Sequence, residues 1–407
     1  MPEWPLLLRI AFRFCVTFFA ITTLYLVIEH ISVLVGVLMP SLIPLGERIG
    51  ENVFLTAYGW ATLQLFGANV QYPTIAGFFA YMVTVLLEAG LGTLVWTAVD
   101  HRRREYRRAH AWLRIYLRYL LAAVMFSYGM VKVIPAQFPP PSLIQLITPL
   151  GEFTRMRLLW LSMGAAPAYS IFTGLCEVSG GLLLFSRRTA TLGALIVAAS
   201  LSNVVALNFA YGVGVQLNST VYLLMALTLL APETRRLADV FILRPVASAE
   251  RHLPRDVWMR RGVTIAKLLV IVWMIGVYVG EAYVARSSGR PAPALYGIYD
   301  VETFTRGGVE LARGDGARWQ RFVVAERDTA AVQTASRPVE RYRVRHDALA
   351  HTLTLIPLEG QGDRLILRYT HEADGRLLVE GSIRSDAVQA HLRAVDLTQF
   401  PLRQPLR

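Results

Sequence analysis

Apolar stretches long enough to cross a membrane follow one another through residues 1–285, and residues 291–407 contain none. A helix of about 20 apolar residues spans the hydrocarbon core of a bilayer. Seven stretches come near this length: Leu8–Glu29, Ile75–Ala98, Leu113–Ile134, Pro167–Ser186, Thr189–Gly212, Gln216–Ala231 and Val263–Ala285. We therefore predict an α-helical polytopic membrane protein with about seven transmembrane helices, in contact with the lipid bilayer.

Arginine is concentrated in alternate loops between these stretches, which predicts the orientation of the chain. The arginine-rich loops are 102–108, 187–188 and 235–261. The other loops carry few positive charges, mainly Arg48, Arg155 and Arg157. Cytoplasmic loops of membrane proteins are enriched in Lys and Arg. We therefore expect a protein of the bacterial cytoplasmic membrane, with its N-terminus in the cytoplasm and residues 291–407 in the periplasm.

Residues 31–66 are the ambiguous part of this topology. Two apolar runs, Ile31–Leu45 and Val53–Phe66, are broken by Pro40, Pro44 and Gly46. One interpretation is an outer loop that lies on the membrane interface as one or two short helices. The other is a re-entrant hairpin. A full extra span would reverse the orientation of the preceding chain and break the arginine pattern.

Residues 291–407 change to short segments in which apolar and polar residues alternate, separated by Gly, Asp and Pro turns. Asp374-Gly375 between Ile366–Tyr369 and Leu377–Val379 is typical of a β-hairpin. We predict a small antiparallel β-barrel or β-sandwich. Four aromatic residues would form its core or line a ligand cavity: Trp319, Phe322, Tyr342 and Tyr369.

Composition excludes several classes of function. The net charge of +12 is carried by loops between spans and not by an aromatic-basic surface, so we expect no nucleic acid partner. Cys15 and Cys176 lie in different spans and outside any CxxC motif, which argues against disulfide exchange. The sequence lacks nucleotide and flavin motifs, and its histidines do not face each other within spans as haem ligands would. We also expect no metal site.

Ionisable residues within spans are costly and are therefore candidates for a functional site. Glu177 lies near the middle of the fourth stretch and Lys132 near the outer end of the third. Lys132 and Lys267 are the only lysines among 41 Lys and Arg residues. Unlike Arg, a buried lysine readily changes its pKa. We predict Lys132 and Glu177 as catalytic residues, although Lys132 could also extend its ammonium group to the outer headgroups.

Four further polar residues lie in the outer half of the same helices, and we predict them as ligand-binding residues: Tyr128, Asn203, Asn208 and Tyr211. Glu177 would lie about 15 Å below the outer surface at a rise of about 1.5 Å per residue. Lys132 would lie closer to that surface, so these depths do not require a direct ion pair. The polar residues could form a funnel that opens outward. Alternatively, each could make an interhelical hydrogen bond that holds the bundle together.

Two motifs resemble the DoxX/DoxD-like family of integral membrane proteins, over residues 113–243. Gly129-Met-Val-Lys132 is similar to a Gly-x-x-Lys at the end of the family's first helix. Glu177-Val-Ser-Gly180-Gly181 is similar to a Glu-x-x-Gly-Gly in its second helix. The resemblance implies a four-helix membrane core and a link to redox chemistry. Members of the DoxD type are subunits of a thiosulfate:quinone oxidoreductase, and others are associated with oxidative-stress membrane complexes.

The chain departs from the short form of that family by two spans before the core, one span after it and a β domain. These additions put the thiosulfate activity in doubt. We divide the chain into two leading transmembrane helices (1–111), a DoxX-like core (112–245), a cytoplasmic loop with the last span and a linker (246–290), and the β domain (291–407).

Three functional hypotheses follow from this reading. The first is a quinone-linked redox component, in which quinone is the cofactor and other envelope or respiratory subunits are the partners. The second is a small-solute transporter. The third is a non-catalytic membrane scaffold whose β domain binds a partner or ligand.

Overall fold

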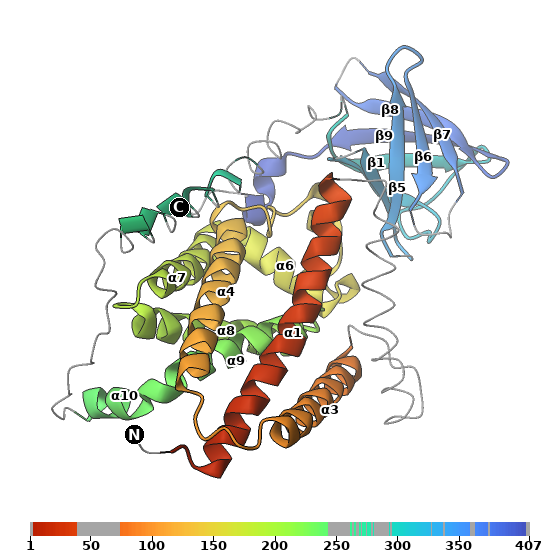
Figure 1. The fold of residues 1–407 in the computed structure, drawn as a ribbon. Helices are drawn as coiled ribbons and strands as arrows, with labels where there is room; N and C mark the ends of the chain where they lie inside the picture. The colour runs from red at the N-terminus through yellow and green to blue at the C-terminus, as the bar shows by residue number, and fades with distance from the viewer. Residues whose placement is uncertain are drawn as a thin grey trace. The chain divides into compact units, whose positions relative to one another are not determined.

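The computed structural model describes residues 3–38, 74–242 and 295–403, apart from 327, 337, 359–362 and 373–374, together with residue 293 and parts of 261–280 (Figure 1). Contacts within the chain separate two compact units. The helical unit comprises Met1–Val133 and Ile171–Gly276, and the barrel unit comprises Ile134–Ser170 and Val277–Arg407. Each unit is described by itself below.

The helical unit is built from long helices joined by short connections. Its main elements are α1 (Leu6–Leu38), α3 (Ile75–Val99), α4 (Arg107–Val133), α7 (Pro167–Phe185), α8 (Ala190–Tyr211), α9 (Gln216–Leu230), the 3-10 turn η3 (Ala231–Glu233) and α10 (Thr234–Phe241) (Figure 1). Residues 31–38 continue α1, whereas 39–66, the rest of the ambiguous segment, lie outside the described residues.

Four helices in the described part of the chain are long and apolar enough to cross a membrane: Leu6–Leu24, Ile75–Val99, Pro167–Phe185 and Ala190–Tyr211. Large apolar side chains such as Leu87, Leu91 and Leu94 are exposed on α3, as expected for a surface that lipid covers. The third and sixth predicted spans are also helices, but α4 begins with charged residues and α9 has 15 residues. The seventh lies largely outside the described residues, so the count of seven stays a prediction.

Glycines set the separation between α4 and α7. A Cβ atom on Gly129 would lie 2.6 Å from the Gly174 carbonyl oxygen, and one on Gly174 would lie 2.7 Å from the Gly129 carbonyl oxygen. Farther along α7, a Cβ atom on Gly181 would lie 2.9 Å from the Ala122 carbonyl oxygen. Small residues are typical of close helix crossings in membranes because they let two backbones touch.

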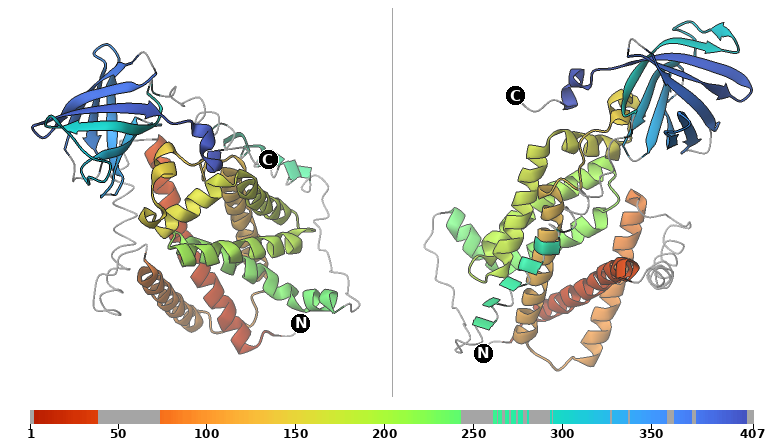
Figure 2. Two further views of the ribbon diagram at one scale, coloured as in Figure 1. Left: turned by 180° about the vertical axis from the view of Figure 1, so that it is seen from behind. Right: turned by 90° about the horizontal axis from the view of Figure 1, so that it is seen from above.

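The C-terminal strands form a closed antiparallel β-barrel (Figures 1 and 2). The strands are β1 (Gly297–Arg306), β2 (Val309–Glu310), β3 (Trp319–Ala325), β4 (Thr329–Thr334), β5 (Glu340–Asp347), β6 (Thr352–Pro357), β7 (Leu365–His371), β8 (Leu377–Ile383) and β9 (Asp386–Ala394). Neighbours in sequence pair with each other, and β1 pairs with both β3 and β9, which closes an eight-stranded barrel beside the short β2. Of the two predicted architectures, the barrel is confirmed.

The barrel encloses its own apolar core. Phe304, Phe322 and Leu367 are fully buried inside it, and strands β5, β7 and β9 alternate buried and exposed residues as one-sided strands do. Closure leaves the long strands without free edges, which are otherwise prone to pairing with other chains.

Strands β3 and β4 are buried on both faces because a short helix covers their outer side. The helix α5 (Leu143–Ile147) belongs to the segment between α4 and α7, together with η2 (Leu150–Glu152) and α6 (Arg155–Ala165). Leu143 packs in one cluster with the outward-facing Val323 and Ala331. The Gln333 side chain also donates a hydrogen bond to the Ile147 carbonyl oxygen at 3.2 Å. Residues 134–170 therefore fold as part of the barrel unit. Two 3-10 turns, η4 (Leu397–Gln399) and η5 (Pro401–Arg403), follow β9.

Candidate functional sites

Lys132 and Glu177 form an ion pair inside the helical unit. The Lys132 ammonium group donates to Glu177 Oε1 at 2.5 Å, and the two side chains are 9% and 2% exposed. Each charged residue follows, by three positions, one of the glycines at the α4–α7 crossing, and residues three apart lie on the same helix face. The contact between Gly129 and Gly174 thus brings Lys132 and Glu177 together, although the depth estimate from the sequence did not require it.

The second carboxylate oxygen of Glu177 has a different environment. Glu177 Oε2 is buried and has no hydrogen-bond partner within the described residues. A buried acceptor without a partner loses the free energy of its hydrogen bond to water. The pair therefore offers one oxygen held by an ammonium group and one that can accept a proton or a hydrogen bond.

Two of the other predicted ligand-binding residues, Asn208 and Tyr128, contact α9. Asn208 donates to the Ser219 hydroxyl at 3.0 Å and so joins α8 to α9. Asn203 is exposed on α8, and Tyr211 is half-buried at its end. Tyr128 makes an edge-on contact with the Tyr222 ring at 5.8 Å. The arrangement of Asn208 corresponds to the interhelical hydrogen bond that was the alternative to a funnel.

A groove in the helical unit lies away from the ion pair. It has a volume of about 370 Å³ and is lined by residues of α1 and α4, including Thr23, Leu113 and Tyr116. The Tyr116 hydroxyl donates to Thr23 at 2.9 Å across this groove. Neither Lys132 nor Glu177 lines it.

Sequence reasoning missed a second buried charge, Arg13 of α1, which is 2% exposed. Its guanidinium group donates to the Tyr106 hydroxyl at 2.8 and 3.0 Å, to the Thr97 hydroxyl at 2.9 Å and to the Asp100 carbonyl oxygen at 2.7 Å. The Tyr106 hydroxyl donates in turn to Asp100 Oδ2 at 2.8 Å. The rule that selected Glu177, an ionisable residue within a span, would also have selected Arg13.

This network lowers the pKa of Asp100, the residue that follows the end of α3. The hydrogen bond from Tyr106 holds the pKa of Asp100 below its ordinary value, with smaller contributions from Trp96, Arg103 and Arg13. The arrangement fastens α1 to the α3–α4 connection. Its groups have partners within the network, as expected of a structural contact.

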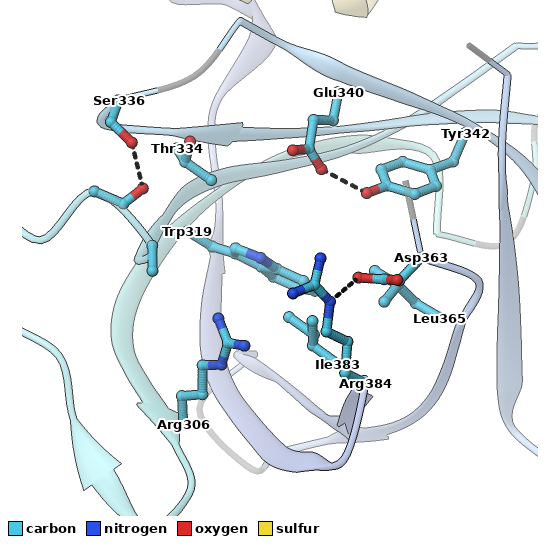
Figure 3. Close-up of a pocket in the computed structure, with 12 residues that line it drawn as sticks. Arg306, Trp319, Thr334, Ser336, Glu340, Tyr342, Asp363, Leu365, Ile383 and Arg384 are labelled. Atoms are coloured by element: carbon cyan, nitrogen blue, oxygen red, sulfur yellow. Dashed lines mark hydrogen bonds and ion pairs between the residues drawn. The ribbon is translucent and has the colours of Figure 1, made fainter. Parts of the chain in front are cut away.

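The barrel unit contains a cavity of about 530 Å³ at one rim of the barrel (Figure 3). All four aromatic residues belong to the buried barrel core, and Trp319 and Tyr342 also line this cavity. Both roles considered for these residues therefore apply to Trp319 and Tyr342. Arg306 and Arg384 also line the cavity, and sequence analysis did not single them out.

The described residues thus combine four helices that are long and apolar enough to cross a membrane with a closed β-barrel that follows them in the sequence. The chain is 32% identical to Uncharacterized protein YwoB of Bacillus subtilis (strain 168) over 136 residues, which make up 33% of this chain and 84% of YwoB. The chain therefore belongs to the same family as YwoB. No protein-family model matches the chain, and no solved structure matches it.

Proposed function

We propose that this chain is a component of a quinone-linked redox system in the bacterial cytoplasmic membrane, with the Lys132–Glu177 pair as its charge- and proton-handling site. The observation that carries the proposal is the buried contact of 2.5 Å between these side chains, with Glu177 Oε2 lacking a partner in the described chain. Ionisable residues held inside a membrane are costly and usually functional. The resemblance to DoxX/DoxD-like proteins supports the same chemistry.

Each member of the pair has a distinct role in this proposal. The Lys132 ammonium group stabilises the negative charge of a reduced quinone or of an anionic reductant. Glu177 accepts one of the two protons that a quinol releases when it is oxidised, through the oxygen that Lys132 does not hold, and the second proton passes to water. Electrons pass to or from a partner subunit of the envelope or the respiratory chain.

The proposed orientation has its N-terminus and the arginine-rich loop 102–108 in the cytoplasm. Contacts within the helical unit support it, because the Trp4 backbone N–H donates to the Arg104 carbonyl oxygen at 3.2 Å and Glu3 forms an ion pair with Arg104. These contacts support the proposal that the start of α1 and the end of α3 lie on the same, cytoplasmic side.

The proposed periplasmic location of the barrel has support of a similar kind. Residues 134–170 connect the end of α4 to the start of α7, and Leu143 within them shares an apolar cluster with Val323 of the barrel. Residues that share a core cannot be separated by a bilayer. This shared cluster supports one side of the membrane for both residues 134–170 and the barrel, which we propose is the periplasmic side.

The test measures bound quinone and quinone-linked turnover in the purified full-length protein. We compare the wild type with Lys132→Ala, Glu177→Gln and the double variant Lys132→Met/Glu177→Met. Replacing both charges with apolar residues of similar size removes the chemistry without leaving a buried unpaired charge. Arg114→Gln, which breaks the Arg114–Glu233 pair of 3.1 Å in the same unit, is the control.

The expected result is a stoichiometric quinone in the wild type and in the control, and its loss from a double variant that unfolds at the wild-type temperature. Two outcomes would contradict the proposal: a wild-type protein that carries only phospholipid, or a folded double variant that keeps both quinone and turnover. The double variant thus separates a chemical role of the pair from a structural one.

A second candidate function is a non-catalytic membrane scaffold or solute-binding protein that uses its barrel to capture a ligand. The specific observation in its favour is the location of the polar cavity, which lies in the barrel unit rather than at the Lys132–Glu177 pair. Solute flux in proteoliposomes distinguishes transport from redox chemistry.

A further inference from the structure

We propose that the rim of the β-barrel binds a small organic monoanion, a carboxylate or phosphodiester attached to an apolar or aromatic body. This site lies in the barrel unit and is independent of the redox proposal for the helical unit. Its volume of about 530 Å³ falls within the usual range of about 300–1,000 Å³ for small-molecule sites.

The barrel topology brings the lining residues together from distant parts of the sequence. Arg306 ends β1, Trp319 begins β3, Tyr342 lies near the start of β5, Leu365 begins β7, and Ile383 ends β8. In an antiparallel barrel, the end of one strand and the start of the next lie at the same rim. The cavity is therefore a product of the closed barrel and not of one flexible loop.

Two guanidinium groups supply the recognition of an anion. Arg306 Nε donates to Asp386 Oδ2 at 2.9 Å, and Arg384 Nε donates to Asp363 Oδ2 at 3.0 Å. Each contact uses the Nε atom of a guanidinium group, and within the described residues the terminal nitrogens make no further hydrogen bond, so they can bind a ligand. Figure 3 shows both groups extending toward the Trp319 ring. Arginine is well suited to carboxylates and phosphates because its donors form a planar fork.

An aromatic and aliphatic floor supplies the recognition of the ligand's body. Trp319 is 4% exposed and stacks on Phe322, with ring centroids 6.1 Å apart and planes inclined by 8°. The β3–β4 register shifts between Trp319 and Arg321, and bulges of this kind redirect side chains at the rims of barrels. Leu365 and Ile383 extend the apolar surface beside the indole.

The packed barrel interior limits how far a ligand can enter. Phe304 and Phe322 are fully buried below the cavity, and eight-stranded barrels are just wide enough to be filled by side chains. A ligand is therefore held at the rim and does not thread through the barrel.

The charges around the cavity select a monoanion over a polyanion. Asp386 and Asp363 each offset one guanidinium charge, and Glu340, which accepts from the Tyr342 hydroxyl at 2.7 Å, adds a further negative charge across the cavity. A ligand with several negative charges would face these carboxylates. A single anionic group can instead bind the terminal nitrogens of the two arginines, on the edge of each guanidinium group away from its Nε contact with Asp386 or Asp363.

The experiment uses the full-length protein in phosphatidylcholine nanodiscs and measures equilibrium binding of naphthoate, with naphthamide and citrate as probes of charge. Naphthamide has the same aromatic body without the negative charge, and citrate has the charge without the body. We expect naphthoate to bind at least about tenfold more tightly than either, as one charge-assisted hydrogen bond accounts for a factor of that size.

Single substitutions then locate the site. Arg306→Gln and Arg384→Gln should each weaken naphthoate binding by about tenfold or more. Arg321→Gln is the matched control, because Arg321 pairs with Asp300 on the same barrel through an Nε contact of 3.0 Å but does not line the cavity. The double variant at Lys132 and Glu177 should bind naphthoate as the wild type does. A failure of the redox proposal can therefore be distinguished from a failure of the proposal for the barrel rim.

The same assay distinguishes the two sources of such an anion. If a lipid headgroup occupies the rim, phosphatidylglycerol in the nanodisc will compete with naphthoate, whereas a site for soluble organic acids will be unaffected. Either result supports the proposal when the arginine variants lose binding. Equal affinity for naphthoate and naphthamide, or full binding by both arginine variants with wild-type melting temperatures, would overturn it.

Discussion

The two units of this protein each contain a close contact between a basic and an acidic side chain, in opposite surroundings. Lys132 and Glu177 are 9% and 2% exposed, whereas Arg306 and Asp386 are 28% and 46% exposed. The Lys132 side chain is largely enclosed by helices. Arg306 keeps its outer nitrogens beside a cavity. Contacts of nearly the same length therefore serve different purposes.

Burial, and not distance, determines what such an ion pair can do. An exposed ion pair contributes only about 0–1 kcal/mol, since water screens it. In a buried pair, desolvation makes each charge depend on the other. The rim arginines can exchange water for a ligand at little cost, whereas the Lys132–Glu177 pair can change its state only by moving a proton or opening the bundle.

The largest expected effect comes from breaking the buried pair by removing one partner. Glu177→Ala leaves the Lys132 ammonium group enclosed and unpaired, so we expect a loss of about 3–5 kcal/mol in unfolding free energy. The double variant Lys132→Met/Glu177→Met should recover most of this loss. Thermal unfolding in detergent measures the cycle. Equal losses in the single and double variants would show that the pair is not coupled and would remove the contrast with the rim.

The second effect tests the glycine crossing that brings the pair together. In Gly174→Ala the new Cβ atom would lie 2.7 Å from the Gly129 carbonyl oxygen, so α4 and α7 must separate. Overpacking of this kind costs about 1–3 kcal/mol. Gly90→Ala is the matched control, as this glycine also lies within a membrane helix but has no atom within 4 Å of the added Cβ. The control should equal or exceed the wild type in melting temperature. Two equally stable variants would mean that the crossing is not tight.

The third effect concerns Tyr106, the hydroxyl that joins Arg13 to Asp100. Tyr106→Phe leaves buried guanidinium donors without their acceptor, which costs about 1–3 kcal/mol. The substitution should also change how the stability of the protein depends on pH in the acidic range. The pKa of Asp100 is lowered in the folded protein, mainly by Tyr106, so its contribution is present above the ordinary pKa and is lost as pH falls through the lower, folded pKa.

The measurement is the melting temperature between pH 3 and pH 7 for wild type and variant. Below about pH 4, where an ordinary aspartate begins to protonate, the wild type should lose stability more steeply than Tyr106→Phe. Parallel curves of melting temperature against pH for wild type and variant would show that the protonation of Asp100 is not coupled to the network. Tyr116→Phe provides a control, because its hydroxyl contacts Thr23 and no titratable group is part of that contact.

The sequence predicted the features that depend on local pattern. Alternating residues and turns predicted an antiparallel β domain. It did not decide between barrel and sandwich, because closure depends on the pairing of Tyr299 with Ala394, residues from opposite ends of the domain. Nor did it show that Leu143, in a loop between spans, covers the barrel.

The candidate sites divide in the same way. Lys132 and Glu177 could be selected singly because charge is rare within spans, but their contact depends on how two helices cross. Asn203 and Asn208 lie five positions apart on α8, which places them on different faces, and only Asn208 is buried. Arg306 and Arg384 are two of many arginines, and only barrel closure gives them a shared cavity.

The smallest expected effect is a gain in unfolding free energy, whereas the substitutions at Glu177, Gly174 and Tyr106 in the helical unit lower it. Arg384 has a φ of 57° in the tight turn between β8 and β9, a left-handed conformation that favours glycine. Its side chain is 75% exposed, so removing it sacrifices only a surface ion pair with Asp363. Arg384→Gly should therefore raise the unfolding free energy of the protein, by no more than about 1 kcal/mol, while weakening naphthoate binding.

This variant separates the effect on stability from the effect on binding in one substitution. An arginine kept in a conformation that glycine would adopt more easily is consistent with a role in the site. Arg384→Gln, which keeps the strained backbone, should lose binding without the gain in stability. If Arg384→Gly instead destabilises the protein, the Arg384–Asp363 contact holds the turn together, and the rim pair resembles the buried pair more closely than its exposure indicates.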